Sequence, residues 1–477
     1  MESMINRRWA RRAAVTHTLA VAAYAATPTL RLAAQTDPWL EAAATVARIR
    51  VPTFPARDFI VTSYGAVGDG RTLCTQAIDN AVRACNAAGG GRVVIPATGS
   101  ARTFLTGAIR LRGNVNLYVD AGATLRFSTD PSHYLPVVRT SFEGSDLFNF
   151  CPLIYAAWRT NVAITGGGTL DGQASNQHWW PWFGAPKWGW TGGPQQNPDR
   201  KLLSEQNTNG VPVAQRVYGA GHYLRPSFIQ PYHCTNVLID GVTVRNAPFW
   251  VLHPLYSRSV TVRNVTVQSL GPNSDGCDIE CCSDVLVQNC RFDTQDDCMV
   301  IKSGRHRDGV VRAAPSHHIV LRGNRVSRGG GAVAIGSEQG SGVHHVYIED
   351  LTGDDPNLYI GLSLKASRRW SAGLVEQIYA RRINLAGVRL EGMTITYKVY
   401  DILDGPYRPI FRDIDVSGMT CGRSKNALKF LGFPDEKIQN VRVSNSTFTN
   451  VSGTGVVKTD VTGLQLTNVR INGVLVG

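Results

Sequence analysis

The feature that most constrains the fold is a repeat of short apolar segments along most of the chain. Each unit holds a short alternating strand, a turn with Asn or Gly, a second short strand and a variable loop, at intervals of roughly 20 to 35 residues. Clear units begin at residues 161, 236, 259, 284, 318 and 345, and further units begin near residues 378, 410, 438 and 461. Because so small a unit cannot bury its apolar face alone, the units have to stack.

Strands this short and regular favour a β-solenoid, in which each coil pairs with the coils above and below it about 4.8 Å away. A β-propeller is the competing fold, but its blades need longer antiparallel units joined by hairpin turns. We therefore expect an all-β fold, with one solenoid domain over residues 58–477. Residues one repeat apart along the chain then become neighbours in space.

One segment near the start of the domain departs from the strand pattern. Between Thr75 and Ala88 the apolar residues fall at helical spacing, at Ala77, Ile78, Ala81, Val82 and Cys85. A run of three glycines, residues 89–91, ends this helix. Because the terminal repeat of a solenoid has to cover the exposed core, we expect the helix to cap the N-terminal end.

Residues 1–34 have the layout of an export signal, and residues 35–57 follow as a linker. Arginines between residues 7 and 12 precede a mostly small and apolar run, Ala13 to Ala26, which is too short to span a bilayer. Residues 23–25 and the region 32–34 are candidate cleavage sites. A disordered basic tail is the alternative. We expect a secreted or periplasmic protein, since no later segment is long and apolar enough to cross a membrane.

The formal net charge is +13, and +9 remains without the five Arg and one Glu of residues 1–34. A basic surface attracts polyanions. Nucleic acid is one candidate, but the chain has no basic helix or recognised nucleic-acid module. An exported protein meets an acidic polysaccharide more readily. We therefore expect an acidic polysaccharide as the partner, no nucleic acid and no membrane, and a monomeric protein.

Half of the ten cysteines lie close together in the chain, at Cys277, Cys281, Cys282, Cys290 and Cys298. After export some of the ten can form disulfides, with a connectivity that the sequence does not give. The cluster lacks paired CxxC or Cys/His spacing, so we expect no metal and no cofactor. Small apolar side chains that face into the stack are the favoured role for several of them.

Two aspartate motifs lie about one repeat apart, Asn273-Ser274-Asp275-Gly276 and Thr294-Gln295-Asp296-Asp297-Cys298. Stacked coils would bring Asp275 next to the second motif, and both Asp296 and Asp297 reach one cleft only if the backbone bends there. Carboxylates that converge raise the pKa of one of their number. A protonated acid beside ionised carboxylates is what hydrolysis of a glycosidic bond requires. Solvated turn aspartates are the alternative.

Residues 176–198 interrupt the repeat with a tryptophan-rich segment that holds Trp179, Trp180, Trp182, Trp188 and Trp190. Such a segment can wall a cleft and stack on sugar rings. It can equally fold on itself to bury the indoles. Both interpretations stay open.

From about Phe59 onward the chain resembles glycoside hydrolase family 28, the polygalacturonases that degrade pectin of the plant cell wall. The Asn-Ser-Asp and Gln-Asp-Asp stretches look like the two aspartate motifs of that family. Residues 225–226, 248–254 and 335–338 look like further family segments. The resemblance implies a right-handed parallel β-helix and hydrolysis of pectic galacturonan with inversion.

By that resemblance Asp296 is the general acid, and Asp275 and Asp297 activate the water. Inversion needs room for this water, roughly 6.5 to 9.5 Å between the acid and the base. A non-catalytic solenoid that binds polysaccharide is a second hypothesis. A polysaccharide lyase on the same fold is a third, and it would need a base and usually calcium, which Asp-rich turns can bind.

Two positions depart from the family pattern. Gly330 stands where the family carries the His of Gly-His-Gly, and Ser363 stands where it carries the Arg of Arg-Ile-Lys, while Lys365 matches. Losing a bidentate donor weakens recognition of a carboxylate, because lysine does not reproduce that geometry. The choice between galacturonan and rhamnogalacturonan therefore stays open.

Neighbouring residues can compensate for these two departures. Arg328, Arg368 or Arg369 can replace the missing arginine from a nearby loop. His318 can replace the missing imidazole, although a strand residue in a His-His pair is also typical of a structural or exposed position.

Besides Lys365, we expect five residues to bind substrate or line the cleft: Asn273, His253, Trp250, Lys302 and Glu338. His253 and Trp250 lie on the coil before Asp275, where a packed Trp and a hydrogen-bonded His are the alternative. Lys302 can offset the charge of the aspartates or face solvent. Glu338 lies one repeat beyond them.

Overall fold

The computed structural model describes residues 37–99 and 102–477, so the predicted export signal lies outside the described residues. The chain divides into two compact units, Met1–Glu41 and Ala42–Gly477. Helix α2 (Pro38–Arg48) crosses this boundary, and its last residue, Arg48, forms an ion pair with Asp284 at 2.6 Å within the second unit. Every sheet and the candidate site belong to the second unit.

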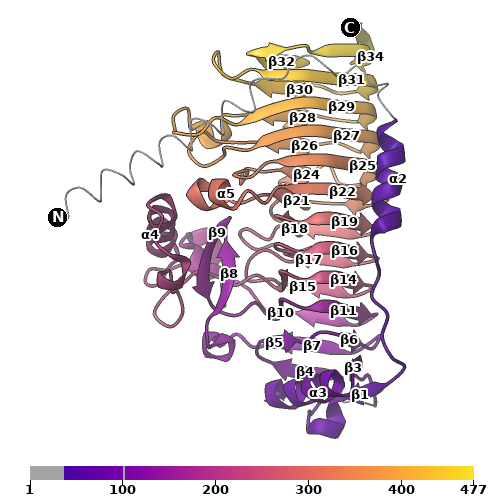
Figure 1. Ribbon diagram of the computed structural model, residues 1–477. Coiled ribbons are helices and arrows are strands. Elements are labelled where there is room, and N and C mark those ends of the chain that lie inside the picture. Colours follow the sequence, from indigo (N-terminus) through magenta and orange to yellow (C-terminus); the bar gives the residue numbers. More distant parts are fainter. Residues whose placement is uncertain (1–36, 100–101) are drawn as a thin grey trace, which may run out of the picture. The chain divides into compact units, whose positions relative to one another are not determined.

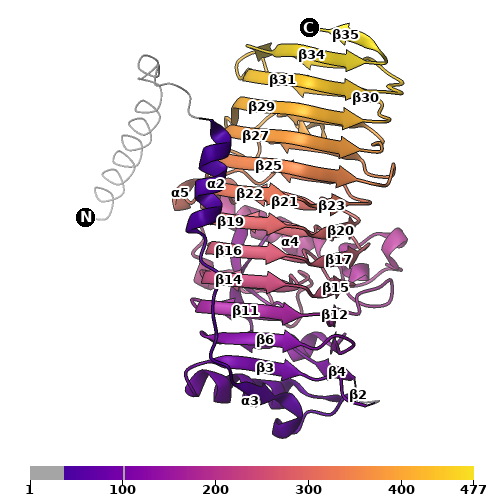
Figure 2. The ribbon, with the colours of Figure 1, turned by 90° about the vertical axis from the view of Figure 1, so that its right-hand side faces the viewer.

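The second unit is a parallel β-helix with three ladders of strands (Figures 1 and 2). The first ladder comprises β1 (Asp58–Ile60), β3 (Gly91–Ile95), β6 (Val115–Val119), β11 (Thr160–Gly166), β14 (Thr235–Asp240), β16 (Arg258–Arg263), β19 (Ser283–Gln288) and β22 (Ser316–Arg322). The second comprises β2 (Asp69–Leu73), β4 (Thr103–Thr106), β7 (Thr124–Phe127), β12 (Thr169–Asp171), β15 (Thr243–Arg245), β17 (Thr266–Ser269), β20 (Arg291–Thr294) and β23 (Arg325–Val326).

The first and second ladders join at β25, because β22 and β23 pair with different halves of that long strand. The stack then continues through β25 (Val343–Gly353), β27 (Leu374–Leu385), β29 (Ile410–Cys421), β31 (Ile438–Phe448), β33 (Val461–Thr462), β34 (Gln465–Ile471) and β35 (Val474–Val476). The third ladder begins with β5 (Ile109–Leu111), β10 (Ile154–Ala157) and β13 (Ile229–Tyr232). It continues with β18 (Cys277–Glu280), β21 (Met299–Lys302), β24 (Gly331–Ile335), β26 (Ile360–Lys365), β28 (Glu391–Thr396), β30 (Asn426–Leu431) and β32 (Val456–Thr459).

The repeat in the sequence corresponds to a repeat in backbone conformation. In each of the six clear units the first residue, such as Asn161, Asn236, Asp284 or His318, has a left-handed φ between 53° and 57°. Asn and Asp tolerate this conformation better than most residues. The bend occurs at the same place in each coil, so the apolar residues that follow it stay in register.

This register builds continuous rows of aliphatic side chains inside the coil. Val262, Val287 and Leu321 are successive partners, and the row continues through Ile348, Ala380, Val416 and Val443. All of these side chains are buried. The predicted parallel β-helix is therefore confirmed, with its core inside the coil.

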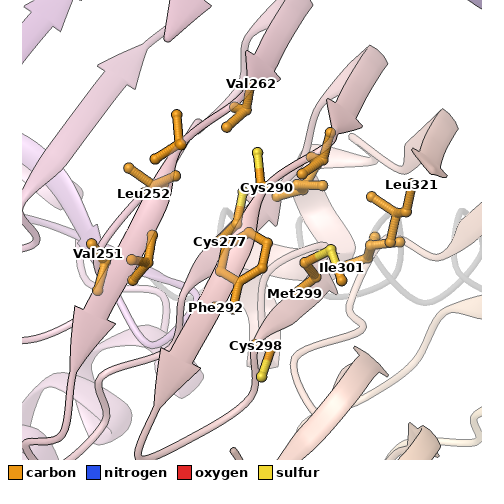
Figure 3. Close-up of a cluster of buried hydrophobic side chains, with 14 of the residues drawn as sticks. Val251, Leu252, Val262, Cys277, Cys290, Phe292, Cys298, Met299, Ile301 and Leu321 are labelled. Carbon is orange, nitrogen blue, oxygen red and sulfur yellow. The ribbon is translucent and has the colours of Figure 1, made fainter. Parts of the chain in front are cut away.

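Cysteines fill part of this core, as Figure 3 shows for Cys277, Cys290 and Cys298 beside Phe292 and Met299. All ten cysteines lie in the described part of the chain, where each is buried and none forms a disulfide. The role as small inward-facing apolar side chains is the one that the structure supports for these thiols.

The predicted capping helix is also present, as α3 (Thr75–Ala87) at the N-terminal end of the coil (Figure 1). Its buried residues are those that the spacing predicts: Ala77, Ile78, Ala81, Val82 and Cys85. They join the core cluster of the coil, so the helix covers apolar side chains that the first strands would otherwise expose.

Other helices were not predicted. Helix α2 lies inside the predicted linker, and α4 (Asn197–Thr208), α5 (His306–Arg312) and the hairpin β8 (Val138–Phe142)–β9 (Ser145–Asn149) lie in insertions between strands. Short 3₁₀ turns are η1 (Val61–Tyr64), η2 (Pro131–Tyr134), η3 (Trp180–Phe183), η4 (Pro186–Trp188), η5 (Val213–Gln215) and η6 (Val399–Asp401). None of the described helices combines the length and the apolar character needed to cross a bilayer.

The tryptophans of residues 176–198 pack on one another, while Phe183 and Asn197 of the same segment line the cleft described below. Trp179 is buried and meets Trp182 edge to face at 5.0 Å, and Trp180 meets Trp188 at 5.9 Å. The indole of Trp180 donates a hydrogen bond to the carbonyl of Ala247 at 3.0 Å. None of the five tryptophans lines the cleft described below.

Candidate active site

A cleft of about 910 Å³ runs along the third ladder. Its floor comes from residues at the ends of β18, β21, β24 and β26, and α4, α5 and the turn of the β8–β9 hairpin gather on this side of the coil (Figure 1). Side chains of α4, the hairpin residue Glu143, and Tyr400, Pro406 and Tyr407 form much of its wall. Insertions between coils thus turn one face of a regular coil into an enclosed groove.

The three predicted aspartates meet on the floor of this cleft. Asp275 precedes β18 and Asp297 precedes β21, and the amide after Asp275, at Gly276, donates to the carbonyl of Asp297 at 2.9 Å. One carboxylate oxygen from each of Asp275, Asp296 and Asp297 lies within 4.8 Å of the others. Stacking therefore brings together residues from two successive coils, as the repeat predicts.

Asp296 and Asp297 both face the cleft because the chain bends between them. Oδ1 of Asp296 accepts a hydrogen bond from the amide of Asp297 at 3.0 Å. The hydroxyl of Thr294 donates to the carbonyl of Asp296 at 2.7 Å. These two bonds stabilise a local turn. An extended backbone would instead point the two side chains to opposite faces.

Two lysines neutralise part of this charge. Lys365, at the end of β26, donates to Oδ2 of Asp297 at 2.6 Å. Lys302, at the end of β21, lies 3.4 Å from Oδ2 of Asp275 and 3.3 Å from Glu338. No ion pair to Asp296 is seen among the described residues, so Asp296 is the member of the cluster without a cationic partner.

The pKa values follow from burial and mutual repulsion. Burial raises the pKa of Asp296, and the charge of Asp297 adds to the rise. Burial and the charge of Asp296 likewise raise the pKa of Asp275, against the opposing charge of Lys302. The carboxyls titrate as one coupled group that retains a proton above the usual range of aspartate.

Five of the six residues predicted to bind substrate line the cleft: Lys365, Asn273, Trp250, Lys302 and Glu338. Asn273 points its amide oxygen at the buried Arg225, which donates to it at 2.8 Å. Trp250 forms part of the floor and lies 4.0 Å beneath the ammonium of Lys302. Burial alone would raise the pKa of Glu338, but the charges of Lys302 and Arg305 lower it to about 2.

One of the predicted substrate contacts needs correction. His253 does not line the cleft, because its ring is fully buried and bonded to Glu280 at 2.9 Å and to Gln230 at 2.9 Å. It lies edge to face against Trp250 and so supports the floor from below. Lys302 lines the cleft, but it is buried and its ammonium lies within 3.4 Å of Asp275 and Glu338, which agrees with the role of offsetting the charge of the aspartates.

The two departures from the family pattern lie at different depths. A Cβ at Gly330 would sit 3.0 Å from Oδ1 of Asp297 and 3.1 Å from Oδ1 of Asp296, so this position adjoins both carboxylates and offers no side chain. Ser363 is buried within β26 and does not line the cleft. His318 lies in a row of histidines on the first ladder, where it stacks on His345 at 4.6 Å, and therefore does not replace the imidazole.

Several residues of the cleft were missed by the sequence analysis. Glu143, from the β8–β9 turn, forms ion pairs with Arg200 of α4 at 2.6 Å and with Arg305 at 2.9 Å. Tyr400 and Trp370 lie together at the rim, with ring centroids 6.4 Å apart. These residues stand in insertions without a repeat, so no spacing in the sequence indicates that they meet.

A fourth aspartate, Asp278, lies beneath the cluster and was also missed. It is fully buried in β18, with Lys302 Nζ 3.4 Å from its Oδ1. Burial raises the pKa of Asp278 well above its usual range, and the charge of Asp275 adds to the rise. One feature of the sequence could have indicated this residue. Asp278 is a charged residue two positions after Gly276, in a strand whose other residues have the pattern of a buried strand.

The arrangement suits proton transfer at a bond held in the cleft. Two carboxyls with raised pKa values, Asp275 and Asp296, lie beside Asp297, which pairs with Lys365, and the three can act on one group. Carboxylate oxygens this close are also ligands that a hard cation accepts. The ammonium groups of Lys302 and Lys365 already supply positive charge at Asp275 and Asp297, which favours the first of these two roles.

Comparison with known proteins agrees with this geometry. The sequence profile of the family described as Glycosyl hydrolases family 28 matches residues 219–445. The crystal structure of a hyperthermoactive exopolygalacturonase from Thermotoga maritima is 38% identical, with a TM-score of 0.86, over 92% of this chain and 97% of that one. A probable polygalacturonase of Vitis vinifera is 26% identical over 81% of this chain and 73% of its own length. An exo-poly-alpha-D-galacturonosidase of Dickeya chrysanthemi is 26% identical over 85% and 69% respectively.

Replacing Asp278 with Asn tests whether this buried carboxyl holds a proton. Its raised pKa means that the folded protein keeps the proton more tightly than the unfolded chain, in which Asp titrates near about pH 3.9. The stability from this group is therefore complete below about pH 4 and is lost as the pH rises toward the folded pKa. Asn has no proton to lose, so the unfolding free energy of Asp278→Asn relative to wild type should rise by up to about 1.4 kcal/mol per pH unit in this window.

Denaturant unfolding at several pH values above about pH 4 measures this difference. Asp404→Asn, at an exposed aspartate, is the control and should follow the wild type in parallel. A parallel course for Asp278→Asn as well would mean that the carboxyl is ionised in the folded protein.

Proposed function

The chain belongs to glycosyl hydrolases family 28, and from this membership we propose that it hydrolyses the galacturonan of pectin. The three similar proteins reported above are named as galacturonan-degrading enzymes, and one of them matches 92% of this chain. The observation that carries the proposal is the convergence of Asp275, Asp296 and Asp297 in one cleft with two lysines. A binding solenoid without activity would need no such cluster, whose mutual repulsion is costly.

Within this proposal Asp296 is the general acid. Asp275 and Asp297 each have a lysine within 3.4 Å, whereas Asp296 has none among the described residues. We assign the transferred proton to Asp296, whose pKa is raised and which is the most exposed of the three to the cleft. Asp296 donates this proton to the oxygen of the leaving sugar, and Asp275 and Asp297 take a proton from the attacking water.

The stereochemical course is proposed as inversion, on the resemblance to the family alone. The nearest oxygens of the three carboxylates lie within 4.8 Å, which is shorter than the roughly 6.5 to 9.5 Å separation expected of inverting enzymes. The separation therefore does not support the predicted gap for a water. Proton NMR of the first anomer released decides the course.

The walls of the cleft support an acidic substrate. Basic side chains at its surface are Arg200, Lys201, Arg305, Lys365 and Arg369. Six acidic side chains line the cleft as well, so attraction of a polyanion depends on cations that have no acidic partner among the described residues, such as Arg369. We propose that Lys365 and Asn273 contact the bound sugar, and that Trp250 provides an apolar surface beneath it.

We also propose that the enzyme acts outside the cytoplasm, where it meets pectin. The support is the basic and apolar layout of residues 1–34. N-terminal sequencing of protein recovered from the periplasm or the culture medium should begin after residue 25 or after residue 34. Intact chains that begin at residue 1 and stay in the cytoplasm would contradict export.

Asp296→Asn should lower kcat on polygalacturonate by at least about 100-fold, because the variant has no proton to donate to the leaving oxygen. The fold should be unchanged, since Asn fits the same space. New reducing ends measured over time give the rate, and circular dichroism checks the fold.

Asp293→Asn is the matched control, since Asp293 lies three residues away and pairs with Arg328 outside the cleft. It should keep the wild-type rate. Full activity in Asp296→Asn would remove Asp296 from the acid role. Products with an ultraviolet-absorbing double bond would overturn hydrolysis in favour of elimination.

Lys365→Ala should weaken the binding of oligogalacturonate by roughly tenfold or more, because it removes a charged donor from the cleft. The loss for the methyl-esterified oligomer, which has no carboxylate, should be much smaller. Calorimetric titration of both ligands into Asp296→Asn protein, with and without Lys365→Ala, compares them without turnover. Equal losses of affinity for both ligands would mean that Lys365 contacts Asp297 and does not bind the carboxylate of the substrate.

A further inference from the structure

The basic residues of the cleft differ in whether the protein itself neutralises them. Lys302 and Lys365 pair with carboxylates of the floor. Arg200 and Arg305 share Glu143, at 2.6 and 2.9 Å. Arg369 also lines the cleft, but no acidic side chain pairs with it in the described part of the chain.

The backbone of Arg369 is held firmly while its side chain is left exposed. Arg369 follows β26 in a tight turn, where its amide donates to the hydroxyl of Ser367 at 3.2 Å. The next residue, Trp370, is buried and lies beneath the guanidinium of Arg305 at 4.6 Å. The turn therefore presents the guanidinium of Arg369 to the cleft from a fixed base.

The neighbours of Arg369 on the α4–α5 side do not compete with it for an anion. His306 lies between these elements, with Nε2 2.9 Å from the hydroxyl of Ser204. Burial, together with the charges of Arg305 and Arg369, lowers the pKa of His306 to about 3. The imidazole is therefore neutral at working pH, and Arg369 is the charged group on this part of the wall that has no partner.

The other two arginines suggested by the sequence are committed elsewhere. Arg328 pairs with Asp293 at 2.6 Å on the outer surface of the coil. Arg368 pairs with Asp435 and with Glu436, and lies over the ring of Phe433 at 3.7 Å. Neither residue lines the cleft. Arg369 is thus the one of the three that a ligand in the cleft can reach.

We propose that Arg369 binds the carboxylate of a uronic acid residue held between the aspartates and the α4–α5 wall. This inference rests on the proposed function and assigns the recognition of acidic sugars, for which Ser363 is too small and too deeply buried, to the turn after β26. A guanidinium matches a carboxylate with two parallel hydrogen bonds. The residue therefore determines specificity, and it takes no part in proton transfer.

The test compares Arg369→Gln with wild type on trigalacturonate and on its methyl ester. The variant should lose at least about tenfold in kcat/KM on the acid, mostly through KM, and should change little on the ester. The kcat/KM of Arg369→Lys on the acid should fall between those of the wild type and Arg369→Gln, because lysine keeps the charge but lacks the planar guanidinium. Arg328→Gln removes the same charge outside the cleft and should match the wild type.

Calorimetric titration of trigalacturonate into Asp296→Asn and into Asp296→Asn/Arg369→Gln separates this inference from the proposed function. Weaker binding in the double variant supports the carboxylate contact, whether or not the wild type cleaves galacturonan. Equal affinity in both proteins, or an equal loss on acid and ester, overturns it. A wild type that cleaves galacturonan while Arg369→Gln is unaffected leaves the function standing and refutes the role of Arg369.

Discussion

The hydrogen bonding of each coil to the next is the constraint on which the rest of the structure depends. A residue in one coil has a fixed partner in the following coil, as Val262 has Val287 and then Leu321. The same register that aligns these buried side chains also places Asp275 beside the coil that carries Asp297. Packing of the core and assembly of the acidic cluster therefore depend on the same register, and a shift in register would disrupt both.

Charge is the second constraint, because the floor of the cleft buries several carboxylates together. Lys302 contacts Asp275, Asp278 and Glu338, each at 3.3 or 3.4 Å, so one ammonium contacts acids from two coils. Burying so many like charges is unfavourable unless some of them hold protons. The stability of the coil therefore keeps these carboxyl groups close together with raised pKa values. Acid catalysis needs such groups.

The walls of the cleft have a different origin from its floor. Glu143 belongs to a hairpin, Arg200 to a helix and Arg305 to a turn, yet the three form one ion-paired group. These segments are insertions, so they can change without disturbing the register of the coils beneath them. This arrangement suits an enzyme in which residues of the floor carry out the reaction and residues of the walls select the substrate.

The sequence by itself determined the coil, the cap and the meeting of the three aspartates, because each of these follows from a period or a spacing that is local in the chain. Only the tertiary structure decided that His253 lies beneath the floor, that Lys302 is occupied, and that Arg369 alone of three candidate arginines reaches the cleft. Those outcomes depend on the packing of insertions that have no period. Contacts such as that of Glu143 with Arg305, 162 residues apart, leave no regular pattern in the sequence.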